Sequence, residues 1–370
     1  MNVFKQHIIL TVLLLICGLL QSQNPQIVLQ QGHKGAIEEI AFNEDGSLMA
    51  TGSKDLHINI VDPYTGLIMS TLRGHTSSVI RILFSNDKKL LISGSSKEVI
   101  VWDLEKEEEL FRTKYGLKHK ENLAVSFDSK LLAYSRSTYK PEVFHLTQNE
   151  SHKMGDEYLE VESEDRFSTY NLQFTKSGKH LLIGGKNGAY LFNLESKLID
   201  LKMSTGQLPR VNYIDHDKNE YFAANNYLNW QNWSLKDGQY LDNFEGKKGD
   251  DRELNKKDFA IINSQHTILG ISSRDYFSLY NLKSGEYLRK CEALKAPSMD
   301  DRLRKGDITA AAFNPRGELL VVATEFEYYQ NDEPLVLLRY FDVSSGREIR
   351  VTDGFYANVN KVAFSPDDKK

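Results

Sequence analysis

Short apolar runs that end in an aromatic residue or Ile recur along the chain, and most are followed by turn-forming residues. The first run ends at Phe42 and is followed by the turn sequence 43–46. The last apolar residue of each run serves as an anchor, and neighbouring anchors lie 39 to 51 residues apart. The eight anchors are Phe42, Phe84, Phe127, Phe174, Tyr213, Ile262, Phe313 and Phe364. This period is the repeat length of a four-stranded propeller blade, so the pattern predicts an all-β propeller.

The first repeat shows how the polar and apolar positions divide into strands. Alternation and turn residues predict strands over 37–42, 48–52, 56–61 and 67–72. A glycine follows the third strand of several repeats, always four residues after the polar residue that closes the strand: Gly66, Gly238, Gly285 and Gly346. A helix would not repeat a glycine at that place, so this spacing supports strands joined by tight turns.

Counting strands gives seven complete blades plus the start of an eighth repeat. Residues 27–33 resemble the fourth strand of a repeat, but the first three strands of that repeat do not precede them. Residues 359–364 resemble the first strand of a repeat, but no further strand follows them. An N-terminal strand of this kind commonly completes the last blade of a propeller and removes an exposed edge. We therefore expect ring closure to depend on strand pairing, and the propeller to be truncated at residue 370.

The N-terminal residues 1–22 differ from the repeats. Lys5 precedes an apolar run that extends to Leu20, and small and polar residues follow it. This is typical of a secretory signal peptide, so we expect cleavage near Ser22, a propeller domain over 23–370 and a secreted or periplasmic protein. A retained membrane anchor and lipidation of Cys17 are the alternatives. Removal of the signal would leave Cys291 alone, which excludes an intrachain disulfide.

The composition and net charge limit the classes of partner that the chain is expected to bind. The 370 residues are 40% hydrophobic and 26% charged, with a net charge of -5, as in ordinary globular proteins. This charge gives no support to nucleic-acid binding, and we expect neither an acidic substrate nor a polyanion as partner.

At several positions the sequence resembles the WD40-repeat family of β-propellers. Gly32-His33 and Gly74-His75 match the family's Gly-His element, residues 51–55 match the segment that ends its second strand, and Trp102-Asp103 match its Trp-Asp pair. The resemblance extends from Gln26 to the C-terminus and is strong only in the first two repeats. The first has Val61 in place of Trp, and the second has Lys97 in place of Asp.

The resemblance implies structural roles for these residues. His33 and Asp55 would form a buried hydrogen bond between two connections, with Thr51 or Ser53 as a further partner. His75 and Trp102 would have the corresponding role in the second repeat. The alternative interpretation is a hydrolytic triad of His33, Asp55 and Ser53.

The sequence contains no strong catalytic, cofactor or metal motif, so we expect no cofactor, no metal site and no enzyme in this segment. The long insertions, at 148–167, 243–257, 291–306 and 325–334, all fall in connections that open on one face of a propeller. The last insertion carries three aromatic residues, which suit a protein partner. The predicted partner-binding residues are Lys54, Arg210, Arg274, Phe326, Tyr328 and Tyr329.

The sequence therefore predicts an exported, non-catalytic scaffold that binds a protein partner through its insertion-bearing face. Two alternatives remain open. The chain could be the N-terminal recognition propeller of a longer enzyme such as a protease, or a propeller that binds a small molecule or metal.

Overall fold

The structure is a computed structural model. It describes residues 32–135, 141–146, 159–160, 169, 171–185, 188–204, 211–225, 227–245, 259–273, 276–292, 307–326 and 335–353. These residues form seven antiparallel sheets of four strands each, with no helix among them.

The strands of the first four sheets are as follows. They are β1 (Ile37–Phe42), β2 (Met49–Ser53), β3 (His57–Val61) and β4 (Ile68–Arg73); β5 (Val79–Phe84), β6 (Leu90–Ser95), β7 (Val99–Asp103) and β8 (Glu108–Arg112); β9 (Leu123–Val125), β10 (Leu131–Ser135), β11 (Pro141–His145) and β12 (Leu159–Glu160); and β13 (Asn171–Phe174), β14 (His180–Gly185), β15 (Gly188–Asn193) and β16 (Ile199–Ser204).

The remaining three sheets continue the same order. They contain β17 (Val211–Asp215), β18 (Glu220–Ala224), β19 (Asn229–Ser234) and β20 (Tyr240–Glu245); β21 (Ala260–Ile262), β22 (Ile268–Ser272), β23 (Tyr276–Asn281) and β24 (Tyr287–Glu292); and β25 (Asp307–Phe313), β26 (Leu319–Phe326), β27 (Leu335–Asp342) and β28 (Glu348–Asp353).

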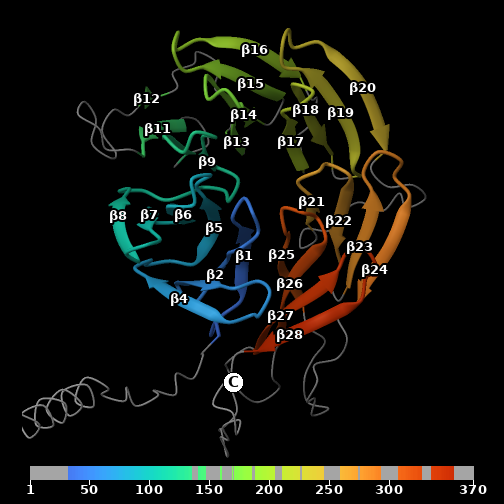
Figure 1. The fold of residues 1–370 in the computed structure, drawn as a ribbon. Helices are drawn as coiled ribbons and strands as arrows, with labels where there is room; N and C mark the ends of the chain where they lie inside the picture. Colours follow the sequence, from blue (N-terminus) through green and yellow to red (C-terminus); the bar gives the residue numbers. More distant parts are fainter. Residues whose placement is uncertain are drawn as a thin grey trace, which may run out of the picture. The chain divides into compact units, whose positions relative to one another are not determined.

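Each sheet is one blade made of four consecutive strands, and the blades follow one another around a ring (Figure 1). The first strands of neighbouring blades touch, as β1 does with β5 and with β25. The prediction of an all-β propeller with seven blades is confirmed. Segments 27–31 and 359–364, assigned to an additional repeat, lie outside the described residues.

The recurring glycines close the turns between third and fourth strands. Gly66 has a φ of 76°, and its N–H donates to the carbonyl of Asp62 at 2.7 Å. Gly346 has a φ of 69° and makes the same bond to Asp342 at 2.8 Å. Because a side chain strains the backbone at positive φ, glycine recurs at this place in the repeat.

The core is divided among the junctions between blades. Seven clusters of buried apolar side chains each combine two neighbouring blades, one cluster for every junction of the ring. Alternate residues of a strand face opposite sides of its sheet, so each blade contributes to two clusters. No blade can therefore bury its apolar surface without both neighbours.

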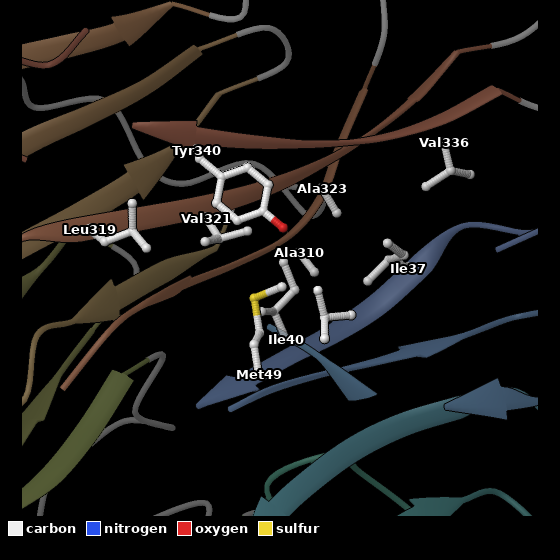
Figure 2. Packing of buried hydrophobic residues seen from close by; sticks show 10 residues of the cluster. Ile37, Ile40, Met49, Ala310, Leu319, Val321, Ala323, Val336 and Tyr340 are labelled. Atoms are coloured by element: carbon white, nitrogen blue, oxygen red, sulfur yellow. The ribbon is translucent and has the colours of Figure 1, made fainter. Parts of the chain in front are cut away.

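The junction between the last and first blades is packed like the others (Figure 2). Ile37, Ile40 and Met49 of the first blade contact a surface that includes Val321 and Tyr340 of the seventh. The guanidinium of Arg350 in β28 also donates to backbone carbonyls in the turn between β3 and β4. Among the described residues, side-chain packing therefore joins the two blades. The strand pairing expected at ring closure involves segments outside the described residues, so it stays a prediction.

Two expectations about boundaries are corrected. Segment 148–167 is predicted as an insertion, but it contains β12, which pairs with β11 and completes the third blade. The other insertions begin later than expected, because β20, β24 and β26 extend to Glu245, Glu292 and Phe326. The pairing of a short outer strand is decided by its neighbour in space, which local sequence does not reveal.

The described part of the chain contains no helix of the length and apolarity that a membrane crossing needs. Residues 1–22 lie outside the described residues, so the signal peptide stays a prediction. Cys291 is buried between the sixth and seventh blades, where burial raises the pKa of its thiol to about 11.

Candidate functional site

The first candidate site is the network around His33. His33 Nδ1 donates to Asp55 at 3.0 Å, and Nε2 accepts from the hydroxyl of Thr51 at 2.8 Å. The carboxylate of Asp55 also accepts from the backbone N–H groups of Lys34 at 2.8 Å and His57 at 3.0 Å. His33 lies before β1 and Asp55 lies between β2 and β3. The network therefore ties the connection that enters the blade to the turn inside it, and both open on the same face.

The electrostatics of this network favour a charged Asp55. Burial by itself would raise the pKa of the Asp55 carboxyl, but hydrogen bonds from His33 and from two backbone N–H groups outweigh it. The pKa of Asp55 is lowered to about 2.

Ser53 is not aligned for hydrolysis. Its hydroxyl donates to the carbonyl of Gly35 at 2.8 Å and accepts from the N–H of Asp55 at 3.1 Å. Both ring nitrogens of His33 bond to other residues, and the side chains of Ser53 and Thr51 are buried. A triad needs a nucleophile that reaches both the histidine and a substrate, so this arrangement acts in packing.

The second blade carries a matching network around His75. Its Nδ1 donates to Glu98 at 2.9 Å, and its Nε2 accepts from the hydroxyl of Ser93 at 2.7 Å. The indole N–H of Trp102 donates to the same hydroxyl at 2.8 Å. One proton arrangement, with the hydrogen on Nδ1, satisfies all three contacts.

Glu98 is a residue that sequence reasoning missed. Alignment by spacing places Lys97 where the family has Asp, but Lys97 is exposed and Glu98 accepts the bond from histidine. In the first blade Thr51 pairs with Asn59, whereas in the second Ser93 pairs with Ile100, so the turn is one residue shorter. The longer side chain of Glu98 reaches the place that Asp55 occupies in the first blade.

Glu98 accepts more bonds than the one from His75. The N–H and the hydroxyl of Thr76 donate to its two oxygens at 3.0 and 2.7 Å, and the hydroxyl of Ser95 donates at 2.9 Å. Burial would raise the pKa of Glu98, but the bonds from Thr76, His75 and Ser95 outweigh it and lower the pKa to about 2. Burial lowers the pKa of His75, so the pair is a carboxylate with a neutral imidazole.

We expect the first network to stabilise the fold. His33→Ala or Asp55→Ala should each lower the free energy of unfolding by about 1 to 3 kcal/mol, because the remaining partner is left buried and unpaired. Thermal unfolding of each variant, beside Lys54→Ala as an exposed control, measures this loss. An unchanged melting temperature together with lost binding or hydrolysis would contradict the structural assignment.

A surface pocket adjoins the second network. Its volume is about 860 Å³, and it lies among the turn between β6 and β7 and the connections on either side of the second blade. The residues lining it are Thr76, Ser96, Lys97, Glu98, Lys114, Tyr115, Gly116, Leu117 and Lys118. No sequence motif marks this pocket, because its walls come from three separate segments.

Charged side chains also link the inner strands. Arg81 on β5 donates to Glu39 on β1 at 2.9 Å, and its second terminal nitrogen lies 3.4 Å from Glu121. The ammonium of Lys120 is 3.7 Å from Glu39 and 5.7 Å from the ring centre of Phe259, which precedes the sixth blade. These contacts connect blades that are not all neighbours in the ring.

The predicted partner-binding residues fall into three groups. Lys54 is exposed, and its ammonium lies 3.4 Å from Glu38. Phe326 is only 5% exposed at the end of β26, and the guanidinium of Arg339 stacks over its ring at 5.8 Å. Its assignment as a surface anchor is wrong, because it belongs to the strand and faces the interior. Arg210, Arg274, Tyr328 and Tyr329 lie outside the described residues.

The described residues contain no group of three or more His, Cys, Asp or Glu side chains arranged to hold a metal ion. The polar clusters found in the first two blades are instead paired hydrogen-bond networks.

Comparison with known proteins identifies the family of two repeats in the sequence and the fold of the chain. The WD40 family model, described as WD domain, G-beta repeat, matches residues 24–62 and 66–103. Human Coronin-2A is 30% identical over 39% of this chain and 32% of its own length. Subunit I of eukaryotic translation initiation factor 3 from Schizosaccharomyces pombe is 25% identical over 29% of this chain and 33% of its own length. The chain thus matches about a third of the length of these relatives.

Among solved structures, the Cps50 (Swd1) β-propeller domain of Myceliophteria thermophila superposes with a TM-score of 0.64. The superposed region covers 80% of this chain and 96% of that domain, with 15% sequence identity, so the match shows a common fold. The chain therefore carries WD40 repeats at its N-terminal end, where both hydrogen-bond networks lie, and folds as a seven-bladed β-propeller.

Proposed function

We propose that this protein is an exported, non-catalytic scaffold that binds a protein partner. Binding would use the loop face, which we define as the face carrying the connections between blades and the turns between second and third strands. WD40 propellers typically act as protein-interaction scaffolds, and this supports the proposal.

One observation carries the proposal. In the first two blades the residue types that could perform chemistry are buried and hydrogen-bonded to one another, while the pocket described above opens beside them on the loop face. Buried, satisfied polar groups serve packing, whereas an accessible concave surface serves recognition.

The opposite face has turns that bind each other. The ammonium of Lys88 contacts Asp45 at 2.5 Å, the amide of Asn86 donates to the carbonyl of Phe127 at 2.9 Å, and the hydroxyl of Ser264 donates to the carbonyl of Pro315 at 2.5 Å. Each contact joins the turns of two neighbouring blades. Groups used in this way are less available to a partner.

A photo-crosslinking side chain should distinguish the two faces. Placed at Lys54 on the loop face it should give a discrete adduct with a protein partner, and placed at Lys106 in the turn between β7 and β8 it should not. Both side chains are exposed, so accessibility is matched. Adducts from Lys106 alone would place the partner on the other face.

Tyr328 and Tyr329 stay the proposed aromatic anchors, and their double Ala variant should weaken binding by about 2 kcal/mol or more.

Export has its own test. Because the apolar run before Gln21 has the length and flanks of a signal peptide, the exported chain should begin at or near Gln23. N-terminal sequencing of material recovered outside the cytoplasm measures this. A chain that still begins with Met1 would contradict cleavage.

A further inference from the structure

We propose that the pocket on the second blade binds an acidic peptide segment of the partner, and this rests on the proposed scaffold function. We call it the lysine pocket, because Lys97, Lys114 and Lys118 belong to its lining. They come from two segments, the turn between β6 and β7 and the connection from β8 to β9.

The connection is held in a fixed position. The N–H of Leu117 donates to the carbonyl of Ser95 at 2.7 Å, and the Leu117 side chain is buried in the core between the second and third blades. A side chain at Gly116 would come within 2.3 Å of the Ser95 carbonyl and 2.4 Å of the Lys97 nitrogen. Only glycine allows the two backbones to approach so closely, and this approach keeps Lys114 and Lys118 beside Lys97.

The hydroxyl of Thr113 fixes the start of the same connection. It donates to the carbonyl of Tyr115 at 2.6 Å and accepts from the N–H of Val99 at 2.8 Å. A pre-organised loop loses little conformational entropy when a ligand binds, so its charges are well placed for recognition.

Within the part of the chain that the structure describes, the three ammonium groups have no anionic partner. All three lysines are exposed, and among the described residues no carboxylate oxygen lies within 4.0 Å of any of their nitrogens. Glu98 lines the pocket, but its two oxygens already accept bonds from His75, Thr76 and Ser95. The pocket therefore has an excess of positive charge, although the whole chain has a net charge of -5.

The size and chemistry of the pocket favour an acidic peptide over a nucleic acid. A nucleic acid would need a basic surface along its backbone, and the net negative charge of the chain opposes such an extended polyanion. A short acidic stretch needs only local complementarity. Tyr115 is 44% exposed, with the Lys114 ammonium 5.6 Å from its ring centre, and it offers an aromatic surface beside the charges. Aromatic surface of this kind is enriched in protein interfaces.

The test uses a fluorescently labelled peptide of alternating Glu and Gly, followed by anisotropy with the full chain. A peptide of alternating Gln and Gly is the neutral control. The acidic peptide should bind and the neutral peptide should not, and binding should weaken roughly tenfold at about 0.5 M salt because exposed charges are screened.

Lysine-to-glutamine variants test whether the acidic peptide binds at the lysine pocket. Lys97→Gln/Lys114→Gln/Lys118→Gln should weaken binding roughly tenfold, since three exposed ion pairs are lost. Its matched control, Lys130→Gln/Lys236→Gln/Lys283→Gln, removes the same charge from turns on the opposite face and should bind like the unaltered chain. Thermal unfolding of both triple variants should match that of the unaltered chain, because all six side chains are exposed.

Three outcomes would overturn the proposal: equal losses in the two triple variants, displacement of the peptide by inorganic phosphate at similar concentration, or equally tight, equally lysine-dependent binding of duplex DNA. The second outcome would indicate a small-anion site and the third a nucleic-acid site. If the loop-face crosslink still forms while no acidic peptide binds, the scaffold function stands and the lysine pocket alone is refuted.

Discussion

Tyr340→Ala should lower the free energy of unfolding by about 3 to 5 kcal/mol. Tyr340 is fully buried at the junction that closes the ring, where its ring faces the cluster containing Met49 and Ile40 (Figure 2). The guanidinium of Arg350 also stacks on it, 3.8 Å from the ring centre. The variant removes apolar contacts and leaves a cavity between the first and last blades.

Urea denaturation of the full chain measures this loss. Tyr227→Ala is the control, because Tyr227 is 47% exposed and the hydrogen bond to its neighbour Asn225 uses only its backbone N–H. The control should lose less than about 1 kcal/mol. If Tyr340→Ala and Tyr227→Ala were equally stable, packing at this junction would not hold the ring closed.

Glu98→Ala should have the second-largest effect, a loss of about 3 kcal/mol. The substitution leaves His75, the N–H of Thr76 and the hydroxyl of Ser95 without their shared acceptor. Glu98→Gln keeps one oxygen acceptor, so its free energy of unfolding should fall by less. Glu105→Ala, which removes an exposed carboxylate in the turn after β7, should have little effect on thermal unfolding.

The same residue predicts a dependence on pH. The folded pKa of Glu98, about 2, lies below the ordinary value near 4.3, so the folded state favours the charged form. The resulting stabilisation, about 3 kcal/mol, is fully present above about pH 5 and is lost as pH falls towards 2. Denaturation at several pH values should show a shallower acid dependence in Glu98→Gln than in the unaltered chain. Equal dependence would mean that Glu98 does not contribute.

The repeat and the turns could be predicted from the sequence because they are local. Strand alternation and the glycine at Gly66 depend on backbone geometry within a few residues, and the recurrence of apolar runs at a blade-length period predicts a propeller. His33, Asp55 and Thr51 could also be singled out, since the family's spacing holds without change in the first repeat.

Other features could not be predicted because they depend on register and on partners distant in the chain. The turn before Glu98 is one residue shorter than its counterpart, and a match by position therefore selected Lys97. Phe326 reads as part of an aromatic loop, but the ladder of β26 with β27 extends through it and turns it inward. The contact between the first and last blades depends on side chains that are distant in the sequence, such as Ile40 and Val321.

The sequence by itself determined the blade architecture, since a periodic apolar pattern leaves each blade unable to bury its faces alone. The tertiary structure decided which polar and charged side chains are buried and which are exposed to a ligand. It buried the histidine networks of the first two blades and brought Lys97 next to Lys114 and Lys118 through the close approach at Gly116. Net charge averages over the whole chain, whereas a ligand meets only the charges that folding places within a Debye length of one another.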